Sequence, residues 1–260
     1  MRCQEVIFLP HHLLNQKSDM AWYTDWFDSP YYPILYANRD HREARLFLDN
    51  LMKNLLPVAD TRILDVGCGR GRHSVYLNKM GYDVTGVDLS VKSIEECKKH
   101  ESSGLHFHVH DMRKLLATNY FDIALNLFTS FGYFDRDNDN KKVVINTTKA
   151  LKPGGHLILD FMNTRHVIEN LVHNEVKLES GIEFHINRNH SDGMIVKDIE
   201  FENKGKTHQF KERIHAYTPE QIEQFIIESG LSIIDVFGDY NLNTFDTEKS
   251  PRLIIHGIKY

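Results

Sequence analysis

The sequence has few of the features that mark secreted, disulfide-rich or membrane-spanning proteins. It contains 3 cysteines in 260 residues, and Cys3, Cys68 and Cys97 show no Cys-x-x-Cys spacing. This argues against a disulfide framework and a zinc site. No apolar run approaches the roughly 20 residues that a transmembrane helix requires. The N-terminal apolar stretch is too short for a signal sequence and lacks a small-residue cleavage site. These absences predict a cytoplasmic protein with no membrane contact.

An excess of positive charge is also absent. The chain has 31 Lys and Arg against 36 Asp and Glu, a formal charge of −5. Proteins that bind nucleic acid attract its phosphates with clustered basic residues, so this balance argues against a nucleic-acid partner. The 41% hydrophobic and 26% charged content is ordinary for a globular protein. The length suits one sizeable α/β domain with an insertion, or two small domains.

Short apolar stretches alternate with helical patterns along most of the chain. This alternation predicts a parallel sheet with right-handed crossover helices, because parallel neighbours need such connections. Near the end, Thr218 and Pro219 predict the start of a helix that Gly230 terminates. We therefore predict an α/β fold with a doubly wound, seven-stranded, mostly parallel sheet. The predicted strands are 63–66, 83–88, 105–110, 121–128, 156–162, 231–238 and 252–260, with helices at 41–56, 74–80, 91–99, 138–151 and 219–229.

The alternation stops at residues 164–216. Turns at 191–193 and 203–205 separate stretches in which polar and apolar residues alternate, as in an antiparallel sheet with one covered face. We predict a three-stranded meander inserted after the fifth main strand. Ligands of such α/β sheets bind at the carboxyl ends of the strands, from which this insertion departs. The predicted organisation is an aromatic-rich cap (1–40), a main domain (41–163 and 217–260) and the insertion (164–216).

The most informative segment is ILDVGCGRGRHSVYL, residues 63–77. Asp65 ends a strand, and the three glycines that follow allow backbone to approach a ligand closely. A dinucleotide-binding loop has the spacing G-x-G-x-x-G, whereas Arg72 stands where its third glycine would be. The observed spacing, D-x-G-x-G-x-G, resembles motif I of the class I S-adenosylmethionine-dependent methyltransferases.

The resemblance continues over about residues 60–162. Asp88 ends the second strand and matches the family's acidic residue that accepts hydrogen bonds from both ribose hydroxyls, which suits the two oxygens of a carboxylate. Asp111 and Met112 match the place where a carboxylate and an apolar side chain contact the adenine. The resemblance implies S-adenosylmethionine as cofactor, with S-adenosylhomocysteine as product, on a Rossmann-like methyltransferase fold with a β insertion. The implied cofactor-binding residues are Asp65, Gly67, Cys68, Gly69, Gly71, Asp88, Leu89, Ser90, Asp111, Met112 and Asn126.

Several of these residues have an alternative structural interpretation. Asp111 suits the N-cap of a helix beginning at Met112. Asn126 ends the fourth strand, where it either faces the methionine part of the cofactor or satisfies nearby backbone. His106, His108 and His110 alternate along one strand face, but a metal site needs further ligands, so we predict packing there and no metal.

The reaction itself requires few specialised side chains. Methyl transfer is an in-line displacement at a carbon bonded to a positive sulfonium, so the protein mainly aligns the reactants and excludes water. A general base is needed only when the acceptor must lose a proton. No catalytic residue is therefore assigned, and nothing in the sequence selects one of the insertion's histidines, His185, His208 or His215, as a base.

Two segments are expected to cover the cofactor. Residues 19–36 are rich in aromatics, and Tyr36 and Arg39 are predicted to donate hydrogen bonds to the cofactor's carboxylate. The alternative is that these aromatics only pack a helix against the sheet. The resemblance implies that the insertion shapes the acceptor pocket. Residues after the fourth and fifth strands are predicted to line that pocket, namely Phe131, Tyr133, Asn163 and Arg165.

The sequence therefore predicts a methyltransferase that acts on a small molecule. Residues 126–129 lack the Asn-Pro-Pro-aromatic motif associated with methylation of base or glutamine amino groups, and no Pro-Cys pair exists for a covalent route to cytosine. Two alternatives are a non-catalytic binder of the same nucleosides and an NAD(P)-dependent oxidoreductase. The oxidoreductase would require the longer glycine spacing and a second βαβ half. The acceptor, the methylated atom and the choice between monomer and homodimer stay open.

Overall fold

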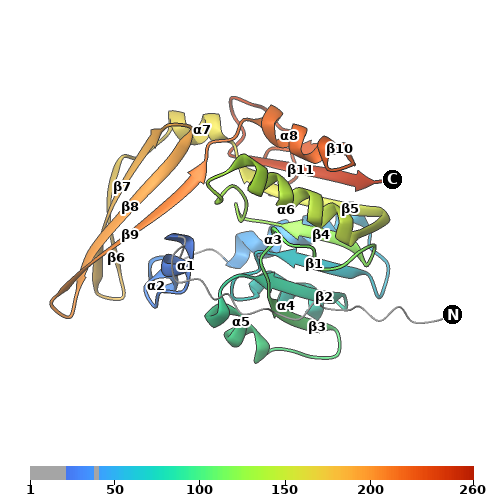
Figure 1. The fold of residues 1–260 in the computed structure, drawn as a ribbon, viewed down its shortest axis with the longest axis horizontal. Helices are drawn as coiled ribbons and strands as arrows, with labels where there is room; N and C mark the ends of the chain where they lie inside the picture. Colours follow the sequence, from blue (N-terminus) through green and yellow to red (C-terminus); the bar gives the residue numbers. More distant parts are fainter. Residues whose placement is uncertain (1–21, 38–40) are drawn as a thin grey trace.

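The computed structural model describes residues 22–37 and 41–260. These residues form two β-sheets with helices packed against them (Figure 1). The main sheet has seven strands in the order β10-β11-β5-β4-β1-β2-β3. The strands β1 to β5 are parallel to one another, and β11 runs antiparallel to both β5 and β10. The predicted doubly wound, mostly parallel sheet is confirmed. Its strands are β1 (Arg62–Val66), β2 (Asp83–Asp88), β3 (Leu105–Val109), β4 (Phe121–Asn126), β5 (Leu151–Met162), β10 (Leu231–Phe237) and β11 (Arg252–Lys259).

Helices cover both faces of the main sheet because its central strands are apolar on both sides. Successive residues of a strand point to opposite faces, so Ile63 packs into one core and Leu64 into the other. The Ile63 core lies under α3 (His41–Leu55), α4 (Arg72–Lys79) and α5 (Val91–Lys98). The Leu64 core lies under α6 (Asp137–Ala150) and α8 (Pro219–Glu228).

Local sequence signals fix the ends of α8 as predicted. The Thr218 hydroxyl accepts a hydrogen bond from the Gln221 amide, and the Gln221 side chain accepts one from the Thr218 amide. This reciprocal pair satisfies two amides that the first helical turn leaves without partners. Gly230 follows the helix with φ of 94°, a conformation that favours glycine.

The second sheet has four strands, in the order β6-β7-β8-β9, so the prediction of a three-stranded meander was wrong. The unpredicted strand, β6, follows α7 (Thr164–Glu169) and lies at the sheet edge. Its Val176 and Leu178 side chains are 59% and 70% exposed, and charged residues occupy the alternate positions. The strand therefore buries no apolar face that its sequence could reveal. The four strands are β6 (Asn174–Glu179), β7 (Ile182–Ser191), β8 (Met194–Asn203) and β9 (Lys206–His215).

Two short helices, α1 (Trp22–Phe27) and α2 (Tyr32–Leu35), lie between the second sheet and the main sheet (Figure 1). We call residues 22–37 the cap. Trp26 and Leu35 of the cap share an apolar core with the inner face of the second sheet, where Phe184 and Phe201 are buried. The cap and the second sheet are thus joined by a core of their own, separate from the two cores of the main sheet.

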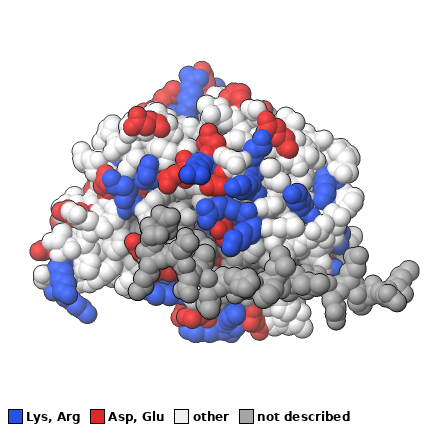
Figure 2. All heavy atoms as spheres, viewed as in Figure 1, with Lys and Arg blue, Asp and Glu red and all other residues white. Residues whose placement is uncertain are grey.

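The surface shows no separation of charge on the face drawn in Figure 2, where basic and acidic side chains lie side by side over much of the area. Among residues 22–37 and 41–260, the helices are too short or too polar to cross a membrane.

The core shared by the cap and the second sheet yields a stability prediction. Phe201→Ala removes a ring that is 1% exposed, and we expect it to lower the free energy of unfolding by about 3–5 kcal/mol. Leu178→Ala, on the exposed side of the same sheet, should change that free energy by less than about 0.5 kcal/mol. Urea unfolding followed by circular dichroism measures both, and equal losses in the two variants would contradict this assignment of the sheet's faces.

Candidate functional site

A cavity of about 350 Å³ lies between the carboxyl ends of β1, β2 and β4 and the cap. Its walls include the glycine-rich turn after β1, the end of β2 and aromatic side chains of the cap. A larger hollow, of about 660 Å³, lies against the second sheet alone. We take the smaller cavity as the candidate site, because parallel sheets bind ligands at the carboxyl ends of their strands.

The glycine-rich turn presents bare backbone to this cavity. Gly67 has φ of 73°, and a Cβ atom there would lie 2.8 Å from the Ser130 Cβ, so only glycine fits. The Gly67 and Cys68 amides both donate to the Val87 carbonyl, at 2.8 and 3.0 Å, which fixes the turn against β2. Around Gly69 no atom lies within 4 Å of an added Cβ. The turn therefore leaves open space beside Gly69.

The Asp88 carboxylate lies at the end of β2 and is held by two backbone amides. The Gly69 amide donates to Oδ2 at 2.9 Å, and the Ser90 amide donates to Oδ1 at 2.8 Å. Each oxygen keeps a further lone pair, so the carboxylate can still accept two hydrogen bonds from a ligand. Burial raises the pKa of Asp88, although the two amides oppose that shift. The side chain lines the cavity.

Asp65 lies on β1, two residues before Gly67, and does not line the cavity. Its carboxylate is 1% exposed and accepts a hydrogen bond from the Ser74 hydroxyl at 2.6 Å. Burial, with a smaller contribution from the negative charge of Asp88, raises the pKa of Asp65 to about 6, and the Ser74 hydrogen bond opposes the shift. A buried carboxylate without a cation bound to it is costly when ionised.

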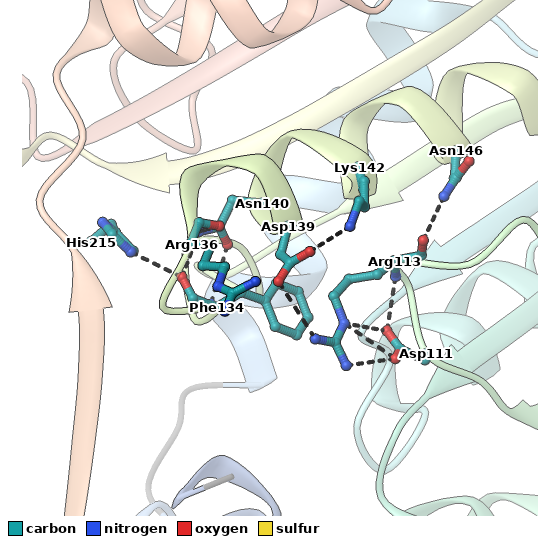
Figure 3. Close-up of polar contacts among 9 residues, drawn as sticks. All are labelled: Asp111, Arg113, Phe134, Arg136, Asp139, Asn140, Lys142, Asn146 and His215. Atoms are coloured by element: carbon teal, nitrogen blue, oxygen red, sulfur yellow. Dashed lines mark hydrogen bonds and ion pairs between the residues drawn. The ribbon is translucent and has the colours of Figure 1, made fainter. Parts of the chain in front are cut away.

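Asp111 lines the cavity beyond the end of β3 and is paired with Arg113 (Figure 3). The Arg113 Nε and Nη2 atoms lie 3.0 and 2.7 Å from the two Asp111 oxygens. Burial alone would raise the pKa of Asp111, but the hydrogen bonds from Arg113 outweigh it and hold that pKa below its ordinary value. The Arg113 guanidinium also lies over the Phe134 ring, 4.4 Å from its centre. No helix begins at Met112, so Asp111 is not an N-cap.

Asn126 and Gly71 do not line the cavity either. The Asn126 amide donates to the Val66 carbonyl at 3.3 Å. Its Oδ1 atom is buried and has no hydrogen-bond partner among the residues the structure describes. An added Cβ at Gly71 would lie 2.8 Å from the Phe107 ring, so Gly71 permits core packing rather than ligand contact. Of the residues predicted to bind the cofactor, the structure brings to the cavity Gly67, Cys68, Gly69, Asp88, Leu89, Ser90, Asp111, Met112 and Tyr36.

Tyr36 lines the cavity, but its hydroxyl reaches the second sheet. It donates to Glu212 Oε1 at 2.5 Å, and Lys197 donates to the same hydroxyl. The Trp26 indole N–H also donates to Glu212 Oε1, at 2.6 Å. These contacts tie the cavity wall to β8 and β9. The other predicted donor, Arg39, lies outside the described residues.

Of the four residues predicted to line an acceptor pocket, only Tyr133 lines the cavity. Phe131 is 1% exposed and packs against Phe161 in a core of the main sheet. The Asn163 amide donates to the carbonyls of Thr247 and Ser250, at 2.9 and 2.8 Å.

Arg165 forms exposed ion pairs with Glu169 and Glu248, at 2.9 and 3.3 Å. Phe131, Asn163 and Arg165 therefore do not meet the cavity. Asn163 and Arg165 instead contact the connection between β10 and β11.

Sequence reasoning did not single out a second group of lining residues around Phe128. The His73 ring stacks on the Phe128 ring with centres 4.9 Å apart, and the Arg72 guanidinium lies 4.6 Å from the centre of the same ring. All three residues line the cavity. Arg72 and His73 open the helix after the glycine turn, a position that could have identified them, because helix N-termini face the ligand in such folds.

The structure also gives the positions of the candidate histidines. His208 contacts the Tyr31 hydroxyl, His215 contacts the Phe134 carbonyl (Figure 3), and His185 lies beside Glu183 at 3.0 Å. None of the three lines the cavity. Within residues 22–37 and 41–260, no three His, Cys, Asp or Glu side chains gather in an arrangement that could hold a metal ion.

Comparison with known proteins gives consistent similarities. Residues 63–155 match the family described as a methyltransferase domain. The chain is 32% identical over 111 residues to the putative methyltransferase YqeM of Bacillus subtilis (strain 168), covering 42% of this chain and 45% of that protein. It is 26% identical over 245 residues to a glycine/sarcosine N-methyltransferase of Halorhodospira halochloris, covering 90% of this chain and 87% of that one.

A crystal structure of an S-adenosylmethionine-dependent methyltransferase from Clostridium acetobutylicum ATCC 824 has the same fold. It superposes with a TM-score of 0.74 at 21% sequence identity, and the match covers 88% of this chain and 96% of that one. The match in fold therefore extends well beyond residues 63–155.

The raised pKa of Asp65 predicts a pH-dependent stability. Because the folded protein favours the protonated carboxyl, the stability that this group contributes is full below its unfolded pKa near 4. It is lost as pH rises through the folded pKa of about 6. Asp65→Asn cannot ionise, so its stability relative to wild type should increase by about 1–1.5 kcal/mol between pH 5 and pH 8. Urea unfolding at the two pH values measures this difference. If Asp65→Asn and wild type differ in stability by the same amount at pH 5 and at pH 8, Asp65 does not titrate in this range.

Proposed function

We propose that this class I S-adenosylmethionine-dependent methyltransferase transfers the methyl group to a small-molecule acceptor by direct in-line displacement. The observation that carries this proposal is the pairing of a bare glycine turn with Asp88 at the neighbouring strand end, both facing one cavity. Bound S-adenosylmethionine supplies a methyl group activated by a positively charged sulfur.

The residues of the cavity fit such a nucleoside. Asp88 would accept hydrogen bonds from the ribose hydroxyls, because its two oxygens are oriented by amides and retain acceptor capacity. Asp111 and Met112 would contact the adenine. The open space beside Gly69 leaves room for close backbone contact. The buried Asn126 Oδ1 has no partner among the described residues, so it suits a donor such as the ammonium of the methionine part.

The charges around the turn favour a cationic ligand. Asp65 and Asp88 carry carboxylates at the ends of adjacent strands, and burial raises the pKa of both. A positive charge nearby would stabilise their ionised forms and so lower both pKa values. Aromatic side chains of the cap, including Phe27 and Tyr32, line the facing wall. We propose that they exclude water and position the acceptor, which is the protein's main task in this chemistry.

We further propose that the acceptor is an amine. One relative whose match covers 90% of this chain is named a glycine/sarcosine N-methyltransferase. A neutral amine attacks with its own lone pair and loses its proton afterwards, so the displacement itself needs no general base. On this proposal, residues 164–216 form the acceptor cover, residues 1–40 form the aromatic-rich N-terminal segment that contains the cap, and the remainder forms the methyltransferase domain.

The first experiment separates the classes of function. Calorimetry with S-adenosylhomocysteine, S-adenosylmethionine and NAD should give binding of the two sulfur nucleosides and none of NAD. Transfer of labelled methyl groups is then measured with glycine, sarcosine, other small amines and matched alcohols. Labelling of amines supports the full proposal, and labelling of alcohols alone contradicts the amine acceptor. Binding without any labelling would favour the non-catalytic binder.

Asp88→Ala tests the ribose contact. The variant should bind S-adenosylhomocysteine more weakly by about 1.5–3 kcal/mol, which is the range for hydrogen bonds to a charged group. Asp83→Ala is the matched control, because Asp83 begins the same strand and pairs with Arg62 at 3.8 Å, away from the cavity. Calorimetry measures both affinities. If the two variants bind like wild type, the ribose does not contact Asp88.

A further inference from the structure

The turn after β4 has an unfavourable backbone conformation. Phe128 and Thr129 have φ of 54° and 61°, in the left-handed region that favours glycine. Thr129 is β-branched, and such residues adopt this conformation rarely. Two consecutive left-handed residues other than glycine persist only when their surroundings hold them there.

This turn forms part of the cavity wall. Leu127, Phe128 and Ser130 line the cavity. The Ser130 hydroxyl lies 3.3 Å from the Gly67 carbonyl oxygen and 2.9 Å from the Leu127 carbonyl oxygen, and its one proton is shared between them, so the turn also packs against the glycine turn. A change in its conformation would therefore displace the wall beside the glycine turn.

Asp160 of β5 holds both strained residues. Its side chain is 0% exposed, and its Oδ2 atom accepts a hydrogen bond from the Phe128 amide at 2.7 Å. Its backbone carbonyl accepts one from the Thr129 amide at 3.1 Å. Asp160, on the neighbouring strand, thus accepts hydrogen bonds from the amides of both left-handed residues.

Arg252 of β11 neutralises and orients the buried carboxylate. Its Nε and Nη2 atoms lie 2.8 and 2.7 Å from Asp160 Oδ1, and Nη2 also donates to the Thr129 hydroxyl at 2.8 Å. The Tyr240 hydroxyl donates to Asp160 Oδ2 at 3.3 Å. A buried ion pair is often no more stabilising than apolar residues of the same volume. Its presence here is therefore better explained by the conformation that it imposes on the turn.

We propose that Asp160 and Arg252 are positioning residues for the cofactor end of the cavity. Neither side chain lines the cavity, and both act through Phe128 and Thr129. By holding the turn in its left-handed form, the pair sets the wall that faces the glycine turn. This inference rests on the proposed function for its ligand, whereas the conformational part can be tested in the ligand-free protein.

Asp160→Asn tests the inference with two measurements. Hydrogen exchange of the Phe128 and Thr129 amides is followed in the ligand-free protein, and the affinity for S-adenosylhomocysteine is measured by calorimetry. We expect faster exchange at both amides and an affinity about 10- to 100-fold weaker, since a small misplacement of a binding wall has effects of this size. Should this variant fail to fold, Arg252→Lys keeps the charge and removes the two-pronged contact.

A second substitution distinguishes positioning from general stability. Asparagine adopts the left-handed conformation more readily than threonine, so adding Thr129→Asn to Asp160→Asn should recover part of the affinity. His256→Gln is the matched control, because His256 lies on β11 with Arg252, is 4% exposed, and is hydrogen-bonded to His156 at 3.0 Å. It should lower the unfolding temperature and leave amide exchange in the turn and ligand affinity unchanged.

The inference is overturned if folded Asp160→Asn keeps the wild-type amide exchange and the wild-type affinity. It is also overturned if His256→Gln loses as much affinity as Asp160→Asn, or if adding Thr129→Asn to Asp160→Asn recovers no affinity. Failure of the wild-type protein to bind S-adenosylhomocysteine would count against the proposed function alone. Exchange at Phe128 and Thr129 would then still decide whether Asp160 holds the turn.

Discussion

The hydrogen bond from the Gly69 amide to the Asp88 carboxylate joins the ends of two adjacent parallel strands. It requires glycines, because the turn adopts positive φ and Ser130 occupies the space that a side chain at Gly67 would need. It also requires an acidic residue at the last position of β2, where the carboxylate can receive the Gly69 and Ser90 amides. This connection between β1 and β2 places the bare glycine turn and the Asp88 carboxylate side by side on one wall of the cavity.

The parts of the site that the sequence could predict are those that local rules determine. The glycine spacing after β1 and the acidic residue ending β2 each depend on a few neighbouring residues, and both segments line the cavity. The strand and helix alternation likewise depends on local periodicity, and it gave the correct main sheet. Strand β6 escaped prediction because it buries no apolar face, with Leu178 70% exposed.

Residues whose side chains depend on distant segments could not be placed from local rules. Asn163 was expected at the cavity, but it satisfies carbonyls at Thr247 and Ser250, more than 80 positions away in the chain. Phe131 was likewise expected at the cavity, but it is buried in a core of the main sheet, just after the left-handed residues Phe128 and Thr129. The amides of those two residues donate to Asp160, and Arg252, 92 positions further along the chain, contacts the Asp160 carboxylate. No short pattern around residue 128 predicts either partner.

The shared core of the cap and the second sheet has a consequence for how molecules enter and leave. Separating Trp26 and Leu35 from Phe184 and Phe201 would expose a large apolar area to water, which opposes any motion that divides these parts. The cap meets the main sheet through smaller contacts, such as the Ser90 hydroxyl with Asp28 and the Tyr133 ring with Phe27. A displacement of the cap is therefore expected to carry the facing strands of the second sheet with it rather than to divide the two.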